Sequence, residues 1–212
     1  MTVLYLHGFA SGPGSSKAAY FRHVLAAAGQ AVEVPDLAAG DFEHLTLTGQ
    51  LAVVGRAGAG RRVSLIGSSM GGYLAALYAA RHPEVERVVL LAPAFGFARR
   101  WRAHLGAEAV ARWRETGHME VFHYGENRSM NLGYQLLEDA DPYEDYPDFR
   151  QPALIFHGSA DDVVPARYSQ EFAHGRPNVR LEILNSGHEL TDVLDYIGPK
   201  VLEFLIFSSM KS

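Results

Sequence analysis

Short, continuous apolar runs alternate along the chain with longer segments in which apolar residues recur every three or four positions. The runs are rich in β-branched and aromatic residues, which is typical of strands buried on both faces of a parallel sheet. Strands are predicted at Thr2–His7, Ala31–Pro35, Arg62–Gly67, Arg87–Ala92, Ala153–His157 and Val179–Leu184. Helices are predicted at Ser15–Gly29, Leu45–Ala57, Met70–His82, Val164–Ala173 and Glu189–Phe207. We therefore expect βαβ units, an α/β fold with about six mostly parallel strands, and a kink or break at Gly198-Pro199 in the last helix.

The segment Gly96–Arg150 interrupts this alternation, because it contains no clear strand. Positions 101, 105, 109 and 113 recur every four residues, which predicts one face of a single helix carrying both tryptophans. A plain connection needs only a few residues. We therefore predict one domain over 1–212, with a helical lid insertion at 96–150 above the strand ends. Trp101, Trp113 and Phe122 then either line a substrate pocket or anchor the insertion to the core.

Composition narrows the class of protein. With 212 residues, 48% of them hydrophobic and 20% charged, the chain can bury a sizeable core. A net charge of −5 disfavours nucleic acid as a partner, and the lack of cysteine excludes disulfides, thiolate metal sites and cysteine nucleophiles. The first ten residues do not resemble a signal peptide, and the run Val201–Phe207 is too short for a membrane span. We expect a soluble cytoplasmic protein.

One pentapeptide carries candidate chemistry. Gly67-Ser68-Ser69-Met70-Gly71 fits G-x-S-x-G between a predicted strand and a predicted helix. In that context the turn is tight, and it lifts the Ser69 hydroxyl above the sheet at a helix N-terminus, where negative charge is favoured. The alternative is a glycine-rich turn with an incidental serine. Ser69 is therefore the candidate nucleophile.

A serine hydroxyl needs a base to become a good nucleophile. His188 follows the last predicted strand, and catalytic sites in open α/β sheets gather where strands end. The base in turn needs an orienting carboxylate, and Asp161 follows the fifth predicted strand. Asp162 is the alternative acid, although a turn or a helix cap also accounts for it.

An oxyanion hole would complete this set. Its expected donors are the main-chain N–H of Met70, directly after the candidate nucleophile, and that of Phe9, in the loop after the first strand. His7 precedes that loop, and we interpret it as a structural hydrogen-bonding residue rather than a catalytic one.

Taken together, these motifs make the chain resemble the α/β-hydrolase superfamily. The resemblance rests on LHGF at 6–9, GSSMGG at 67–72, HGSADDVVP at 157–165 and SGH at 186–188. The opening through Ser16-Lys17-Ala18 is similar to that of small bacterial serine esterases and of related acyl-protein-type thioesterases. This resemblance implies a three-layer sandwich that lacks the leading antiparallel strands of larger members. It also implies hydrolysis of a small-molecule ester or thioester through an acyl-Ser69 intermediate, with no cofactor.

Other functions remain open at this stage. The loop at 8–17 lacks the Gly-Lys-[Ser/Thr] of a phosphate-binding loop, and no H-E-x-x-H metal motif occurs. A non-catalytic small-molecule receptor on the same fold is possible, as is a hydrolase of C–C or peptide bonds. Arg99, Arg100 and Arg102 either meet an anionic leaving group, such as a phosphate-bearing thiol carrier, or form a solvated helix face. The sequence gives no prediction of oligomeric state.

Overall fold

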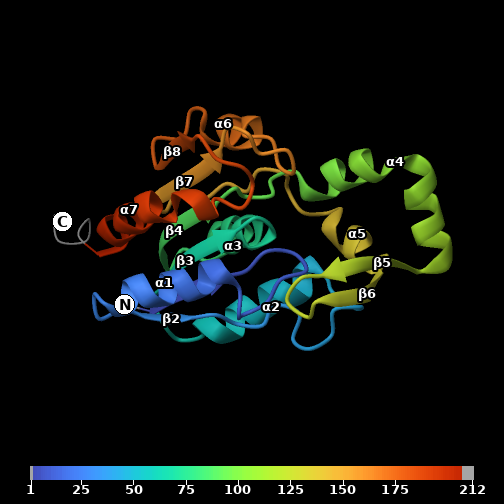
Figure 1. Ribbon diagram of the computed structural model, residues 1–212, viewed down its shortest axis with the longest axis horizontal. Helices are drawn as coiled ribbons and strands as arrows, with labels where there is room; N and C mark the ends of the chain where they lie inside the picture. The colour runs from blue at the N-terminus through green and yellow to red at the C-terminus, as the bar shows by residue number, and fades with distance from the viewer. Residues whose placement is uncertain (1, 207–212) are drawn as a thin grey trace.

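Six parallel strands form the centre of the protein, seen in a computed structural model that describes residues 2–206 (Figure 1). Their order across the sheet is β2-β1-β3-β4-β7-β8, and every neighbouring pair is parallel. The strands are β1 (Thr2–Leu6), β2 (Ala31–Glu33), β3 (Val63–Ser68), β4 (Val85–Leu91), β7 (Ala153–Gly158) and β8 (Val179–Leu184). The predicted parallel sheet is thereby confirmed.

Helices cover both faces of the sheet. One layer contains α2 (Leu47–Gly58), α3 (Met70–Arg81) and α6 (Arg167–Ala173), and the other contains α1 (Ser16–Ala26) and α7 (Leu194–Ile206). Within β4, Val88 and Leu90 pack into the first layer, while Val89 and Leu91 pack into the second. All four side chains are fully buried, and each contributes about 1.5–3 kcal/mol. Burial on both faces explains why the strand sequences are continuously apolar.

Several elements begin or end at other residues than predicted, for local reasons. Strand β2 stops at Glu33, two residues before Pro35, which lacks the N–H that a strand ladder needs. Helix α6 begins at Arg167 rather than Val164, because the Val164 N–H donates to a carboxylate in the preceding turn. A 3-10 turn, η1 (Thr191–Val193), precedes α7, and Phe207 lies outside the described residues.

A kink or a break was predicted at Gly198-Pro199, and the break does not occur, since α7 continues through both residues. Pro199 lies in the second turn, so its missing N–H removes one hydrogen bond, and the buried apolar face of α7 compensates for that loss. Gly198 serves a different purpose. A Cβ atom there would lie 2.3 Å from the Tyr20 hydroxyl oxygen, and this hydroxyl donates to Leu194 O at 2.7 Å. Glycine thus allows α1 and α7 to pack closely.

The 96–150 segment connects β4 to β7 and extends beyond the sheet at one end of the molecule (Figure 1). It contains α4 (Phe97–Thr116), β5 (His118–His123), β6 (Arg128–Gly133) and α5 (Gln135–Ala140). The expectation of a strand-free segment is wrong, because β5 and β6 form an antiparallel hairpin. The expectation of one helix with both tryptophans on a single face is also wrong, because Gly106, with φ 78° and ψ 159°, turns the chain in the middle of α4.

None of the helices in residues 2–206 has both the length and the apolar character needed to cross a membrane.

Candidate active site

Ser69 occupies a sharp turn between β3 and α3, at the edge where the strands end. Its φ of 53° and ψ of −116° are rarely adopted by residues other than glycine, so the turn is strained. Main-chain hydrogen bonds hold this conformation. The Ser69 N–H donates to Leu91 O at 2.8 Å, and Ser69 O accepts from the N–H groups of Tyr73 and Ala94 at 3.1 and 2.9 Å.

The flanking glycines allow a close approach of backbone to backbone. A Cβ atom on Gly71 would lie 2.1 Å from Leu6 O, and one on Gly67 would lie 2.2 Å from Gly71 O. Neither position has room for a side chain. The glycines of the pentapeptide therefore bring the Ser69 turn against the end of β1, next to the loop that follows it.

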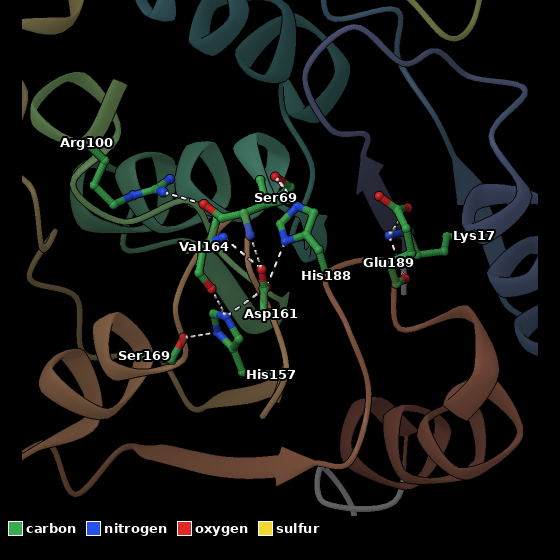
Figure 2. A network of polar contacts seen from close by, with 10 residues as sticks. Lys17, Ser69, Arg100, His157, Asp161, Val164, Ser169, His188 and Glu189 are labelled. Atoms are coloured by element: carbon green, nitrogen blue, oxygen red, sulfur yellow. Dashed lines mark hydrogen bonds and ion pairs between the residues drawn. The ribbon is translucent and has the colours of Figure 1, made fainter. Parts of the chain in front are cut away.

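The structure brings together the side chains predicted from sequence. The Ser69 Oγ lies 3.0 Å from His188 Nε2, and His188 Nδ1 lies 2.8 Å from Asp161 Oδ2 (Figure 2). Asp161 is buried, while Ser69 and His188 are partly exposed. The order of hydrogen bonds is that of nucleophile, base and orienting acid. Asp162 is exposed and has no hydrogen-bond or ion-pair partner among the described residues.

The Asp161 carboxylate accepts hydrogen bonds on both oxygens. Oδ1 accepts from the N–H groups of Val163 and Val164 at 3.0 and 2.7 Å, and Oδ2 accepts from His188 and from His157 Nε2, which lies 3.1 Å away. Burial raises the pKa of Asp161, but these donors together outweigh burial and hold the pKa well below its ordinary value. The carboxylate is therefore an anion at neutral pH, although its side chain is fully buried.

His157 is a site residue that sequence reasoning missed. Its ring is completely buried beneath Asp161, with Nε2 2.7 Å from Val164 O and Nδ1 2.7 Å from Ser169 Oγ (Figure 2). Because Nε2 faces a carbonyl and a carboxylate, it carries the proton and donates, and Nδ1 of the neutral ring accepts from the Ser169 hydroxyl. The HGSADD motif places His157 four residues before Asp161, but only the fold shows that the two side chains meet.

The loop after β1 lies beside Ser69. A Cβ atom on Gly8 would lie 3.6 Å from Ser69 Cβ, and both Phe9 and Met70 line the cavity next to Ser69. The structure shows no hydrogen bond from the N–H of Phe9 or Met70 to another described residue. Both groups are therefore free to meet a ligand oxygen.

His7 orients this loop. Its Nε2 accepts from the Leu37 N–H at 3.3 Å, so the proton is on Nδ1, which donates to Gly8 O at 3.0 Å. Burial lowers the pKa of His7, which favours this neutral ring. No described peptide bond is cis, so the N–H of the Gly8–Phe9 peptide points away from the Gly8 oxygen. His7 thus directs the Phe9 N–H, as a structural rather than a reacting group.

A cavity of about 1360 Å³ surrounds Ser69 and His188. Part of its wall is aromatic, and there Trp101 packs against Phe9 and Phe97 with ring centroids 5.0 Å apart in each case. The loop at 11–15 and the first residues of α1 line another part of the cavity, with the polar side chains of Ser11, Ser15 and Lys17. The cavity therefore offers an apolar side and a polar side to one ligand.

Two of the predicted pocket residues do not line this cavity. Trp113 is buried behind Trp101, at 5.7 Å between centroids, and its Nε1 donates to Leu132 O at 2.9 Å. This hydrogen bond anchors α4 to β6 of the hairpin. The turn at Gly106 lies between Trp101 and Trp113, which pack against each other from the two halves of α4. Phe122 is 46% exposed and points outward from β5. Of the three aromatic residues predicted to bind substrate, Trp101 alone faces Ser69's cavity.

Further contacts fix the surrounding loops. The Lys17 Nζ donates to Glu189 O at 2.8 Å, which ties α1 to the residue after His188 (Figure 2). Tyr124 N–H donates to Ala10 O at 2.7 Å, which ties the hairpin to the loop after β1. Within residues 2–206, no group of three or more His, Cys, Asp or Glu side chains is arranged to hold a metal ion.

Comparison with known proteins places this geometry in context. The profile of the Uncharacterised protein family (UPF0227) matches residues 2–205. None of the curated proteins compared with the chain matches it significantly. Alpha/beta hydrolase domain-containing protein 10 from mouse has a similar structure, with a TM-score of 0.81 and 18% identity over 96% of this chain and 89% of that one.

Two microbial structures are also similar. Est1E from Butyrivibrio proteoclasticus gives a TM-score of 0.79 at 22% identity, over 99% of this chain and 88% of that one. The monoacylglycerol lipase of Paleococcus ferrophilus gives 0.73 at 17% identity, over 96% and 93%. At such identities the similarity establishes the fold alone, and it confirms the α/β-hydrolase fold predicted from the motifs. Because the family profile spans almost the whole chain, the protein belongs to the Uncharacterised protein family UPF0227 and has the fold of an α/β hydrolase.

Proposed function

We propose that the protein is a serine hydrolase that cleaves carboxylic esters or thioesters of small molecules. The observation that carries this proposal is the unbroken hydrogen-bond chain from Ser69 through His188 to Asp161, at the floor of a ligand-sized cavity. A buried carboxylate, an imidazole and a strained, partly exposed serine in this order are arranged for acyl transfer.

The first half of the reaction forms an acyl-enzyme. His188 Nε2 takes the Ser69 proton while Oγ attacks the acyl carbonyl carbon, and Asp161 stabilises the resulting imidazolium. The N–H groups of Phe9 and Met70 bind the oxygen that becomes negative, and loss of one such donor costs about 3 kcal/mol. As the tetrahedral intermediate collapses, the imidazolium gives its proton to the leaving alcohol or thiol, and the acyl group stays on Ser69.

The second half returns the enzyme to its starting state. Water enters the cavity, and His188 removes its proton as the oxygen attacks the acyl carbonyl. Collapse of this second intermediate releases the acid, and the proton returns to the Ser69 oxygen. These steps use only groups of this chain and water.

The shape of the cavity supports an acyl or aryl group as part of the substrate. Phe9, Phe97 and Trp101 present a continuous aromatic surface, and flat or extended apolar groups pack well on such surfaces. Est1E has been solved with ferulic acid bound, and its structure is similar to this one at 22% identity. We assign the 96–150 segment as the lid of the same domain, since its α4 and hairpin contribute to the cavity wall.

Labelling with a fluorophosphonate probe tests the proposal. We expect the native protein to be labelled on Ser69, and the Ser69→Ala protein to remain unlabelled and to lose esterase activity. Ser68→Ala is the matched control, because it removes the neighbouring hydroxyl of the same motif and should retain labelling. A folded native protein that is neither labelled nor active on a graded panel of aryl esters and acyl thioesters would instead support the non-catalytic receptor.

A further inference from the structure

Three arginines lie in the first two turns of α4, and two of them have carboxylate partners. Arg99 Nε lies 2.8 Å from Asp145 Oδ2, and Arg102 Nη1 lies 2.6 Å from Asp141 Oδ1. Arg100 forms no ion pair with a described carboxylate, although the Asp161 carboxylate attracts it from a longer distance. The three side chains therefore have different surroundings, although they are neighbours in the sequence.

Arg100 faces the cavity that contains Ser69 and His188. Its Nε donates to Phe95 O and its Nη1 donates to Val163 O, both at 2.9 Å. Figure 2 shows the guanidinium reaching from α4 toward the loop that carries Asp161 and Val164. These bonds fix the orientation of the planar group, and the Tyr168 ring lies 5.3 Å beneath it. Arg100 is thus held in place before any ligand arrives.

Part of this cation has no partner among residues 2–206. The Nη2 amino group makes no hydrogen bond to a described residue, and two neutral carbonyls do not balance the charge. Burial lowers the pKa of Arg100, which shows that its surroundings disfavour the charged form, yet an arginine stays charged in proteins. A partly desolvated charge without a counter-ion is costly, so such groups usually meet an anion when the site is occupied.

The carboxylates near the cavity do not pair with this cation. The Asp161 oxygens are already bonded to two histidine rings and two main-chain N–H groups. Asp36 and Glu126 line the cavity, and neither forms an ion pair with Arg100. The buried Lys17 is paired with Glu189 at 3.3 Å. Asp162 lines the cavity at its exposed rim and forms no ion pair with Arg100. The free edge of Arg100 is therefore available to a ligand in the same cavity as the candidate nucleophile.

We propose that Arg100 binds an anionic oxygen group, such as a carboxylate, on the substrate, and that the protein prefers esters carrying such a group to neutral esters of the same shape. The planar guanidinium matches a carboxylate in geometry and has donors to spare. This inference rests on the proposed hydrolase function for its chemistry, but the binding of an anion can be measured without turnover.

Two pairs of matched esters test the preference. Phenyl 4-carboxybenzoate and phenyl 4-carbamoylbenzoate differ in charge on the acyl side, and 4-acetoxybenzoate and 4-acetoxybenzamide differ on the leaving-group side. We expect kcat/KM to favour the carboxylate in at least one pair by about tenfold to a hundredfold, the range for a hydrogen bond to a charged group. Arg100→Gln should remove this preference, and Arg100→Lys should retain part of it.

Arg99→Gln is the matched control, because it removes a cation from the same turn that lies outside the cavity lining. It should keep the preference of the native protein. The ratio between matched substrates is unaffected by partial misfolding, so a merely structural Arg100 would reduce both members of a pair equally. That result, or a native protein with no preference in either pair, would overturn the proposal.

Calorimetric binding to the Ser69→Ala protein separates this proposal from the proposed function. The probes are 4-hydroxybenzoate and its neutral counterpart 4-hydroxybenzamide. Tighter binding of the carboxylate, abolished by adding Arg100→Gln, would support the anion site even if the native protein hydrolysed no ester. Equal binding of the two probes, or binding of neither, would refute the anion site even if neutral esters were hydrolysed.

Discussion

Replacing Asp161 by asparagine places an amide where the structure provides only donors. Oδ1 of the native carboxylate faces the N–H groups of Val163 and Val164, and Oδ2 faces two ring nitrogens. An asparagine that keeps its oxygen toward the main chain turns its NH₂ group toward His157 and His188. Both rings present N–H groups at that point in the native protein, so donors would face donors.

His188 can relieve this conflict only by changing its tautomer. With Nδ1 accepting from the asparagine, the proton moves to Nε2, which lies 3.0 Å from Ser69 Oγ. The ring then donates to the serine and cannot take its proton. The same substitution in a serine protease lowers kcat about 10⁴-fold, which corresponds to roughly 5 kcal/mol of activation free energy. We expect a loss of this order in Asp161→Asn.

The assay is kcat for an aryl ester at saturating concentration, with folding checked by circular dichroism. Asp162→Asn is the matched control, since Asp162 is exposed and without a partner, and it should keep most of the native rate. If Asp161→Asn keeps more than a tenth of the native kcat, or if Asp162→Asn is the inactive variant, the hydrogen-bond argument is refuted.

The same variant changes the pH dependence of stability. Burial raises the pKa of Asp161, but hydrogen bonds from His157, His188 and Val164 lower it by more, so the folded-state pKa lies below the ordinary value of 3.8. A depressed carboxyl pKa stabilises the fold above its unfolded-state value, and this stability is lost as the pH falls through the folded-state value. The difference in unfolding free energy between the native protein and Asp161→Asn should therefore be constant near neutral pH and shrink below about pH 4. A pH-independent difference in urea titrations would contradict this account.

Other substitutions separate binding, positioning and packing. Trp101→Ala should raise KM for long or aryl esters several-fold, whereas Trp113→Ala should leave substrate preference unchanged and cost about 3–5 kcal/mol in urea unfolding, the usual range for a buried tryptophan. His157→Phe fills the buried space but removes a donor to the triad carboxylate, so kcat should fall about tenfold or more while KM for aryl esters changes little; an unchanged kcat would make the residue purely structural. Gly71→Ala should prevent stable folding, because the new methyl group would lie 2.1 Å from a main-chain oxygen of β1, whereas Gly187→Ala, with no atom within 4 Å, should have a Tm close to the native one.

The sheet was predictable because its strands are buried on both faces. Continuous apolar runs are rare outside such strands, and Val179–Leu184 was predicted with the bounds that β8 has. Strand β4 begins at Val85, two residues before the predicted start. The prediction missed this start because the charged, half-buried Glu86 and Arg87 separate Val85 from the apolar run that follows. Pattern therefore locates the buried centre of an element more reliably than its ends.

For the candidate site, chain order and strand ends were sufficient to propose that Ser69, Asp161 and His188 lie together. Parallel strands all end at one edge of the sheet, so residues that follow them meet there whatever their distance in sequence. His157 was not identified in this way, because it lies within β7 and its side chain points beneath the site rather than out of the loop. Which hydrogen bonds a buried ring makes depends on packing that no motif records.

The 96–150 segment was the least predictable part, for two physical reasons. Strand β5 does alternate in burial, with Met119, Val121 and His123 turned inward. The alternation was hidden in the sequence because outward Phe122 is apolar, inward His123 is polar and the strand is short. In addition, the direction of each arginine on α4 depends on where the helix begins and which way it faces. Helix α4 starts after Gly96, which adopts φ 65°, and successive side chains then rotate by about 100° each. With the helix starting at this point, Arg99 turns toward Asp145 and Arg100 turns toward the cavity. The conformation of Gly96, rather than the pattern of charges, thus decides which arginine faces the cavity of the candidate nucleophile.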